Sequence, residues 1–305
     1  MLQKNCEKQK RVLAIHDISC VGRCSLTVAL PIISAVGIET SLLPTAVLST
    51  HTGGFTGYTY RDLTDDILPI ADHWEKLGLE FDAIYTGYLG SFEQIDIISE
   101  VIKRFKGKDT LVVVDPVMAD NGKLYPSFPE NFPEGMRSLV AIADVVLPNM
   151  TETALLLGEP YKKGPHTREE TEGMLKRLSA IGPGKVVLTG VCFGEGELGA
   201  ASYVAETGEV NYAMQKRIPQ SMHGTGDVFG SALVAGLMSG HSIAKSCELA
   251  VGFTVDSIKR TLSVGDDIDT RYGVRFEQGL GEFIAAIRRG KWLEGVRAQE
   301  MNIFN

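Results

Sequence analysis

The sequence is poor in cysteine, and its cysteines form no pattern. Five are scattered over 305 residues, an odd number without the paired spacing of a disulfide framework or a zinc site. We interpret Cys20 and Cys24 as packing residues. No apolar run approaches the roughly 18–20 residues that a membrane span needs, and no signal-peptide core follows the polar first ten residues. These absences predict a protein of the reducing cytoplasm.

Positive charge is also scarce. The chain carries 30 Lys and Arg against 38 Asp and Glu, a net charge of −8, and no basic block. A nucleic acid or an anionic membrane surface is therefore not the expected partner. Apolar residues, in contrast, make up 44% of the chain, enough for one large core. We expect one domain over residues 1–305, with residues 1–10 flexible, that binds small molecules.

Short apolar runs alternate with longer amphipathic stretches. The short runs have the composition of strands buried on both faces of a sheet. They are Val12–Ile15, Ser41–Leu48, Ala83–Thr86, Leu111–Val114, Asp144–Leu147 and Val186–Thr189. The predicted helices are Ser25–Val36, Leu63–Leu77, Ser91–Phe105, Glu134–Ala143, Thr167–Ala180, Asp227–Met238, Ile243–Arg260 and Phe276–Arg288. This alternation predicts an α/β fold whose mostly parallel central sheet has helices on both faces.

A different pattern follows the sixth predicted strand. Two strand-like runs, Ala200–Ala205 and Val210–Met214, flank a Thr207-Gly208 turn. Close spacing around a turn glycine is typical of an antiparallel hairpin. We expect this hairpin at an edge of the sheet.

Polar or glycine residues follow all six predicted strands. They are His16-Asp17, residues 50–54, Gly87-Tyr88, residues 115–120, Asn149 with Glu152, and Thr189-Gly190. Ligands of open α/β sheets bind beyond the carboxyl ends of the strands. The sequence therefore predicts one binding rim at that edge of the molecule.

The most specific motif is Gly224-Thr225-Gly226-Asp227, directly before an apolar helical stripe. Two glycines let backbone amides crowd together, and the free N–H groups of a helix N-terminus bind anions. A phosphoryl group in transfer is such an anion. The structural alternative for Asp227 is a helix N-cap.

Acidic and amide side chains follow two further strands. Asp115 precedes Pro116, and Asn149 and Glu152 lie in the sequence Pro-Asn-Met-Thr-Glu. Such oxygens, together with phosphates and water, are ligands for Mg²⁺. The alternative for Asp115 is a turn aspartate ahead of a proline.

Taken in order, these motifs resemble those of the pyridoxal kinases, a branch of the ribokinase-like superfamily. The resemblance runs from about residue 12 to about residue 260. It rests on His51-Thr52-Gly53, Thr86-Gly87-Tyr88, Asp115-Pro116-Val117, Asn149 with Glu152, and the box Gly224–Asp227. It implies an ATP-dependent kinase that phosphorylates the 5′-hydroxymethyl group of pyridoxal, pyridoxine or pyridoxamine.

The resemblance also implies residue roles, cofactors and partners. Asp227 would be the catalytic base, and Gly224, Thr225 and Gly226 would form the anion hole. ATP and Mg²⁺ would be held by Asp115, Asn149, Glu152 and Thr189, and the same kinases leave a place for a monovalent cation such as K⁺. The substrate would meet Asp17, Thr52 and Tyr88 beneath a flap that carries Asp120 and Tyr125. A homodimer is implied by analogy.

One departure concerns the substrate. Many pyridoxal kinases have Gln-Ser after the first strand, whereas His16-Asp17 is closer to the hydroxymethylpyrimidine kinases. A hydroxymethylpyrimidine kinase is therefore the alternative, and a catalytically silent ligand-binding protein of this fold is another. The intact Asp227 and its glycines argue against a catalytically silent protein. A dinucleotide-binding dehydrogenase is disfavoured because its glycine fingerprint is missing after the first strand.

Overall fold

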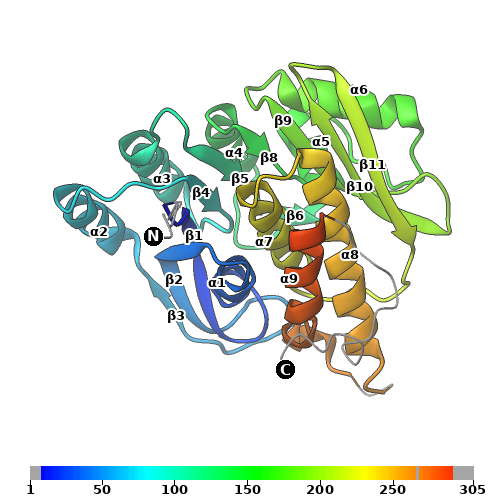
Figure 1. Ribbon diagram of the computed structural model, residues 1–305, viewed down its shortest axis with the longest axis horizontal. Coiled ribbons are helices and arrows are strands. Elements are labelled where there is room, and N and C mark those ends of the chain that lie inside the picture. Colours follow the sequence, from blue (N-terminus) through cyan, green and yellow to red (C-terminus); the bar gives the residue numbers. More distant parts are fainter. Residues whose placement is uncertain (1–7, 266–267, 291–305) are drawn as a thin grey trace, which may run out of the picture.

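A computed structural model describes residues 8–265 and 268–290 (Figure 1). The expectation of a flexible N-terminus falls mainly on residues 1–7, which lie outside the described residues. Within the described part, one nine-stranded sheet has the order β11-β10-β9-β8-β5-β4-β1-β2-β3. No helix in residues 8–265 and 268–290 is long and apolar enough to cross a membrane.

The strands of this sheet are mostly parallel. β1, β2, β4, β5, β8 and β9 run in one direction, and β3 and β10 run against their neighbours. The bounds are β1 Arg11–Val21, β2 Glu39–Thr50, β3 Tyr60–Asp62, β4 Ala83–Thr86, β5 Leu111–Val114, β8 Val145–Val146, β9 Lys185–Val191, β10 Glu197–Val204 and β11 Glu209–Lys216. A separate hairpin consists of β6 Ala119–Asp120 and β7 Lys123–Leu124. Because sequential parallel strands need crossovers, helices lie on both faces of the sheet.

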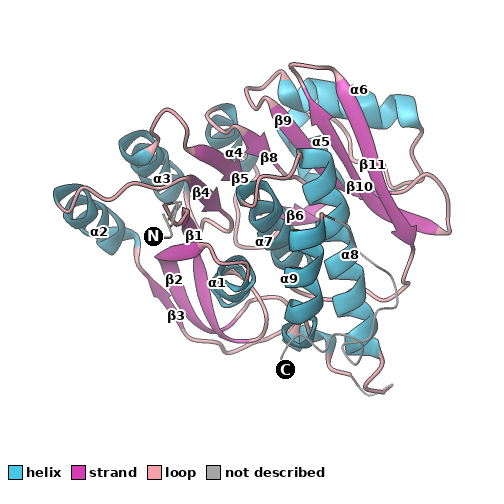
Figure 2. Ribbon diagram, viewed as in Figure 1, coloured by secondary structure: helices cyan, strands magenta, loops and turns pink. Residues whose placement is uncertain are grey.

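Helices pack on the two faces of the sheet, and an apolar layer of side chains forms on each face. The first layer includes side chains from α1 Leu26–Ala35, α7 Thr225–Met238, α8 Ile243–Leu262 and α9 Leu280–Arg289. The other contains α2 Thr64–Lys76, α3 Phe92–Phe105, α4 Phe132–Ala141, α5 Met150–Leu157 and α6 Arg168–Ser179 (Figure 2). Alternate β1 residues face opposite layers, so Val12 packs in the first layer and Leu13 in the second.

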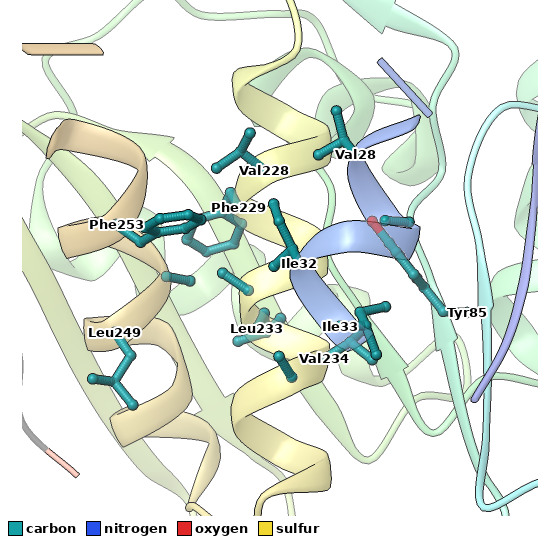
Figure 3. Close-up of a cluster of buried hydrophobic side chains, with 14 of the residues drawn as sticks. Val28, Ile32, Ile33, Tyr85, Val228, Phe229, Leu233, Val234, Leu249 and Phe253 are labelled. Atoms are coloured by element: carbon teal, nitrogen blue, oxygen red, sulfur yellow. The ribbon is translucent and has the colours of Figure 1, made fainter. Parts of the chain in front are cut away.

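Helix α7 lies in the middle of the first layer. Its buried side chains pack between those of α1 and α8, as Figure 3 shows for Val228 and Phe229 beside Ile32 and Phe253. Tyr85 of β4 is fully buried in the same cluster. Because α7 packs against α1, α8 and the sheet, its axis is fixed. The positions of the residues at its N-terminus are fixed with it.

The predicted fold class and the antiparallel edge hairpin are confirmed. The sequence did not predict α5, which has eight residues, nearly all buried, and so lacks an amphipathic stripe. His16 and Asp17 were predicted to follow the first strand, and this placement is wrong. They lie inside the longer β1, where the pairing with β2 shifts register between His16 and Ile18. Thr189 and Gly190, predicted to follow the sixth strand, likewise lie inside β9.

Candidate active site

The N-terminus of α7 is built around Gly224. This residue is the N-cap of the helix, in the left-handed conformation with φ 74°. A Cβ there would lie 2.0 Å from the carbonyl oxygen of Arg23. The first intrahelical bond runs from Val228 N–H to Gly224 O at 3.0 Å, and no side chain caps the preceding amides. The N–H groups of residues 225–227 are therefore oriented to receive an anion.

Asp227 lies in this first turn and is half-buried. It is not the N-cap, because Gly224 holds that position. The pKa of Asp227 is raised to about 7. Burial is the main cause, the negative charge of Asp17 adds to the rise, and hydrogen bonds from the Ser25 amide and the Cys24 thiol oppose it. A carboxyl group with this pKa suits a general base at neutral pH.

Ser25 connects Asp227 with Asp17. Its hydroxyl donates to Asp17 Oδ1 at 2.6 Å, and its amide donates to Asp227. Ser25 is buried and has a positive φ of 55°, a backbone conformation that is costly for a non-glycine residue and is concentrated at functional sites. The sequence indicated only an ordinary serine at the start of a helix, so this role was missed. The contribution of Cys24, interpreted as a packing residue, was missed as well.

The predicted substrate residues are only partly brought together. Asp17 is buried, and its charge contributes to the raised pKa of half-buried Tyr88, whose main cause is burial. The Tyr88 ring lies 5.5 Å from that of Phe128. Thr52, in contrast, is exposed on the loop after β2. Its buried neighbour His51 instead forms hydrogen bonds with the Arg271 carbonyl oxygen and the Gly53 amide.

Asp115 and Glu152 form an acidic pair under the rim. Burial raises the pKa of Asp115 well above its usual value, and the charges of Glu152 and Asp227 add to this rise. Burial also raises the pKa of Glu152, to about 8, against hydrogen bonds from backbone amides. No ion pair within residues 8–265 and 268–290 joins either carboxyl to a basic side chain. Two buried carboxyls in need of positive charge fit a divalent cation.

Asn149 and Glu152 also form the N-terminal capping box of α5. Asn149 Oδ1 accepts from the amides of Thr151 and Glu152 at 2.8 and 2.9 Å, and Glu152 Oε2 accepts from the Asn149 amide at 2.8 Å. Asn149 pairs with Thr189 through a parallel bridge, and the Thr189 hydroxyl donates to Pro148 O at 3.4 Å. The structure thus places two of the predicted nucleotide residues, Asn149 and Thr189, side by side.

The predicted flap is the β6–β7 hairpin. Its two-residue turn has positive φ at Asn121 and Gly122, as tight hairpins prefer. Asp120 is exposed and accepts from the Asn121 amide at 2.8 Å. Tyr125 is half-buried, and burial together with the charges of Glu152, Asp120, Asp115 and Asp227 raises its pKa. The hairpin therefore lies beside the acidic groups of the site.

Comparisons with known proteins identify the family of the chain. The model of the phosphomethylpyrimidine kinase family matches residues 36–271. A pyridoxal kinase of Arabidopsis thaliana is 30% identical over 263 residues, which cover 83% of this chain and 82% of the relative. A structure described as a phosphomethylpyrimidine kinase of Bacteroides thetaiotaomicron VPI-5482, in a crystal form with pyridoxal, is 41% identical at a TM-score of 0.86, covering 90% of this chain and 96% of that one. The pyridoxal kinase structure of Lactobacillus plantarum is 32% identical at a TM-score of 0.84, covering 93% of this chain and 100% of that one.

The fold and the site define an ATP-dependent small-molecule kinase, and the chain belongs to the phosphomethylpyrimidine kinase family. Within it, the resemblance to the pyridoxal kinases that the motifs predicted is confirmed. The predicted enzyme class is confirmed with it.

Proposed function

We propose that this kinase transfers the γ-phosphoryl group of ATP to the 5′-hydroxymethyl group of pyridoxal, pyridoxine or pyridoxamine, a reaction of vitamin B6 salvage. The observation that carries the proposal is Asp227, held by Ser25 and Cys24 at the amide-rich N-terminus of α7. A base beside an anion hole is the arrangement that phosphoryl transfer to an alcohol requires. Relatives named pyridoxal kinase, and the related structure with pyridoxal, support this substrate over hydroxymethylpyrimidine.

In this proposal each group has one task. Asp227 accepts the proton of the substrate hydroxyl, and the amides of Gly224, Thr225 and Gly226 bind the transferred phosphoryl group. Asp115 and Glu152 would hold Mg²⁺, with Asn149 and Thr189 beside the nucleotide. Bound Mg²⁺ neutralises negative charge on the phosphates.

The cellular and molecular setting is part of the same proposal. We place the enzyme in the cytoplasm as a homodimer, with K⁺ as a candidate second cation. The scattered cysteines support this compartment.

A substrate panel tests the proposed reaction. With ATP and Mg²⁺, at least one B6 vitamer should give a 5′-phosphorylated product with a higher kcat/KM than hydroxymethylpyrimidine, because Tyr88 lies among aromatic rings that can pack against a pyridine ring. Product formation is measured by chromatography for each alcohol under the same conditions. The reverse ranking would assign the chain to hydroxymethylpyrimidine phosphorylation instead.

We further propose that the β6–β7 hairpin closes over bound substrate to exclude water, with Tyr125 on its inner side. Closure would protect ATP from hydrolysis. Limited proteolysis should cut residues 120–126 more slowly with an ATP analogue and pyridoxine than without ligands. The exposed β10–β11 turn at Thr207-Gly208 is the internal control, because its cleavage should not change. Equal rates at residues 120–126 in both states would contradict a closing flap.

A further inference from the structure

Tyr85 of β4 reaches from the sheet to the backbone of α7. Its side chain is fully buried, and Figure 3 shows it among the side chains of the first layer. A Cβ added at Gly230 of α7 would lie 2.3 Å from the Tyr85 hydroxyl oxygen and 3.1 Å from Leu147 Cδ1. Glycine permits this close approach of a backbone to a side chain. The helix backbone therefore lies directly on the hydroxyl group.

His16 of β1 holds the Tyr85 ring from the neighbouring strand. The two ring centroids are 4.5 Å apart, in an edge-to-face arrangement. Neither ring nitrogen of His16 has a hydrogen-bond partner within residues 8–265 and 268–290, and burial lowers its pKa to about 3, so the imidazole is neutral. A Cβ at Gly87 would lie 2.1 Å from His16 Nδ1, so the imidazole is closely enclosed. It leaves the tyrosine ring no room to move toward β1.

The Tyr85 hydroxyl lies near two carboxyl groups of the site. Burial raises the pKa of Tyr85 well above its usual value, the charges of Asp115 and Asp227 add to the rise, and the Ser231 hydroxyl opposes it. The hydroxyl therefore stays protonated and neutral. Asp115 follows β5, the strand beside β4, and its amide donates to Thr86 O at 3.0 Å. Tyr85 thus lies where the strands that position Asp115 meet the helix that carries Asp227.

We propose that Tyr85 is a positioning residue, whose hydroxyl sets the distance between α7 and the sheet. Through that distance it sets the placement of Asp227 relative to Asp115. The inference rests on the proposed roles of these two carboxyls. Gly230 lies about one helical turn after Asp227, so a displacement of the helix at Gly230 also moves the base. A misplacement of about 1 Å can lower the rate of a reaction by on the order of 10²-fold.

The first test removes the hydroxyl and keeps the ring. Tyr85→Phe should lower kcat by about three- to tenfold, because α7 loses the group that holds its distance from the sheet. The KM for ATP should stay near its wild-type value, a split that a general loss of structure would not produce. The acceptor is whichever alcohol the wild-type enzyme phosphorylates best, so the test does not depend on the substrate ranking.

The second test pushes the helix away from the sheet. Alanine favours a helix more than glycine does, so harm from Gly230→Ala must come from the collision with Tyr85 and Leu147. We expect kcat to fall by on the order of 10- to 100-fold. In the double variant Gly230→Ala/Tyr85→Phe the hydroxyl is gone, and the next Tyr85 atom, Cζ, lies 3.2 Å from the Cβ position. This variant should regain the kcat of Tyr85→Phe alone, a non-additive result expected for groups in contact.

The double variant also decides the case in which Gly230→Ala does not fold. A folded and active double variant supports the role of the hydroxyl, and an unfolded or inactive one overturns it. Circular dichroism and thermal unfolding report the folded state of each variant. Steady-state kinetics with varied ATP give kcat and the KM for ATP.

Gly236→Ala is the matched control in the same helix. A Cβ there would lie 2.8 Å from Ser246 Oγ of α8, so this collision does not involve Tyr85 and lies farther from Asp227. It should lower the unfolding temperature, keep kcat near the wild-type value and gain nothing from Tyr85→Phe. The inference is overturned if Tyr85→Phe or Gly230→Ala keeps wild-type kcat, or if Gly236→Ala loses as much kcat as Gly230→Ala. Failure of the proposed function is a separate result, since the wild-type enzyme would then phosphorylate none of the alcohols.

Discussion

Replacement of Asp227 by asparagine should remove most of the turnover and leave ATP affinity nearly intact. Asparagine has almost the same size, but it cannot accept a proton from the substrate hydroxyl. A general base contributes on the order of 10² to 10⁴ in rate, and the loss should fall on kcat. ATP affinity, measured by calorimetry, should persist because the amides at the N-terminus of α7 do not depend on this carboxylate.

The pH dependence of kcat/KM is a second test of Asp227→Asn. Since the base acts in its deprotonated form, the competent fraction of the free enzyme rises with pH through the Asp227 pKa of about 7. The wild-type kcat/KM should therefore increase across this range, and the increase attributable to this group should be missing in Asp227→Asn. A folded variant that binds ATP and keeps a normal kcat would leave Asp227 with a structural role. The base would then have to be sought at Asp17 or at His223, which lies against Gly53.

Replacement of Gly224 by alanine should damage both stability and catalysis. A Cβ at this position meets the Arg23 carbonyl at 2.0 Å, and φ is +74°, so the turn before α7 must move. The backbone conformation alone costs about 1–3 kcal/mol for a non-glycine residue. Loss of one aligned amide from an anion hole typically lowers kcat by on the order of 10² to 10³. Thermal unfolding and steady-state kinetics measure the two effects.

The opposite end of the same helix offers a control for Gly224→Ala. Gly240 follows α7 with φ +87°, and a Cβ there would have no neighbour within 4 Å. Gly240→Ala therefore introduces the backbone strain without the collision and lies far from the anion-binding turn. It should lower the unfolding temperature while kcat stays at the wild-type level. Equal kcat losses in the two variants would show that the position of the Gly224 turn is unimportant for transfer.

Much of this site could be predicted because its residues follow buried strands. Asp115 and Asn149 follow β5 and β8, and Thr189 lies in the second half of β9, and the apolar runs before them identify those strands. The Gly224 turn was recognisable because two glycines precede an apolar helix. In these places local sequence and the tertiary fold require the same residue types.

The remaining features depend on contacts between distant segments. Nothing local marks the positive φ of Ser25 or its hydrogen bonds to Asp17 and Asp227. Asp17 lies inside β1 because this strand continues its pairing with β2 beyond the apolar run that identified it. Helix α5 is short and buried on nearly all sides, so it showed no periodicity.

Glu152 of the α5 capping box contacts both the proposed metal site and the proposed lid. Glu152 Oε1 accepts from the amides of Met118 and Ala119 at 3.1 and 3.5 Å, and Ala119 is the first residue of the hairpin. Gly122, at its tip, donates to the Thr151 hydroxyl at 3.0 Å. The carboxyl proposed to hold the metal is therefore also the pivot of the proposed lid. A cation bound at Glu152 would therefore also act on the hairpin backbone through these hydrogen bonds, which would couple cation binding to the position of the lid.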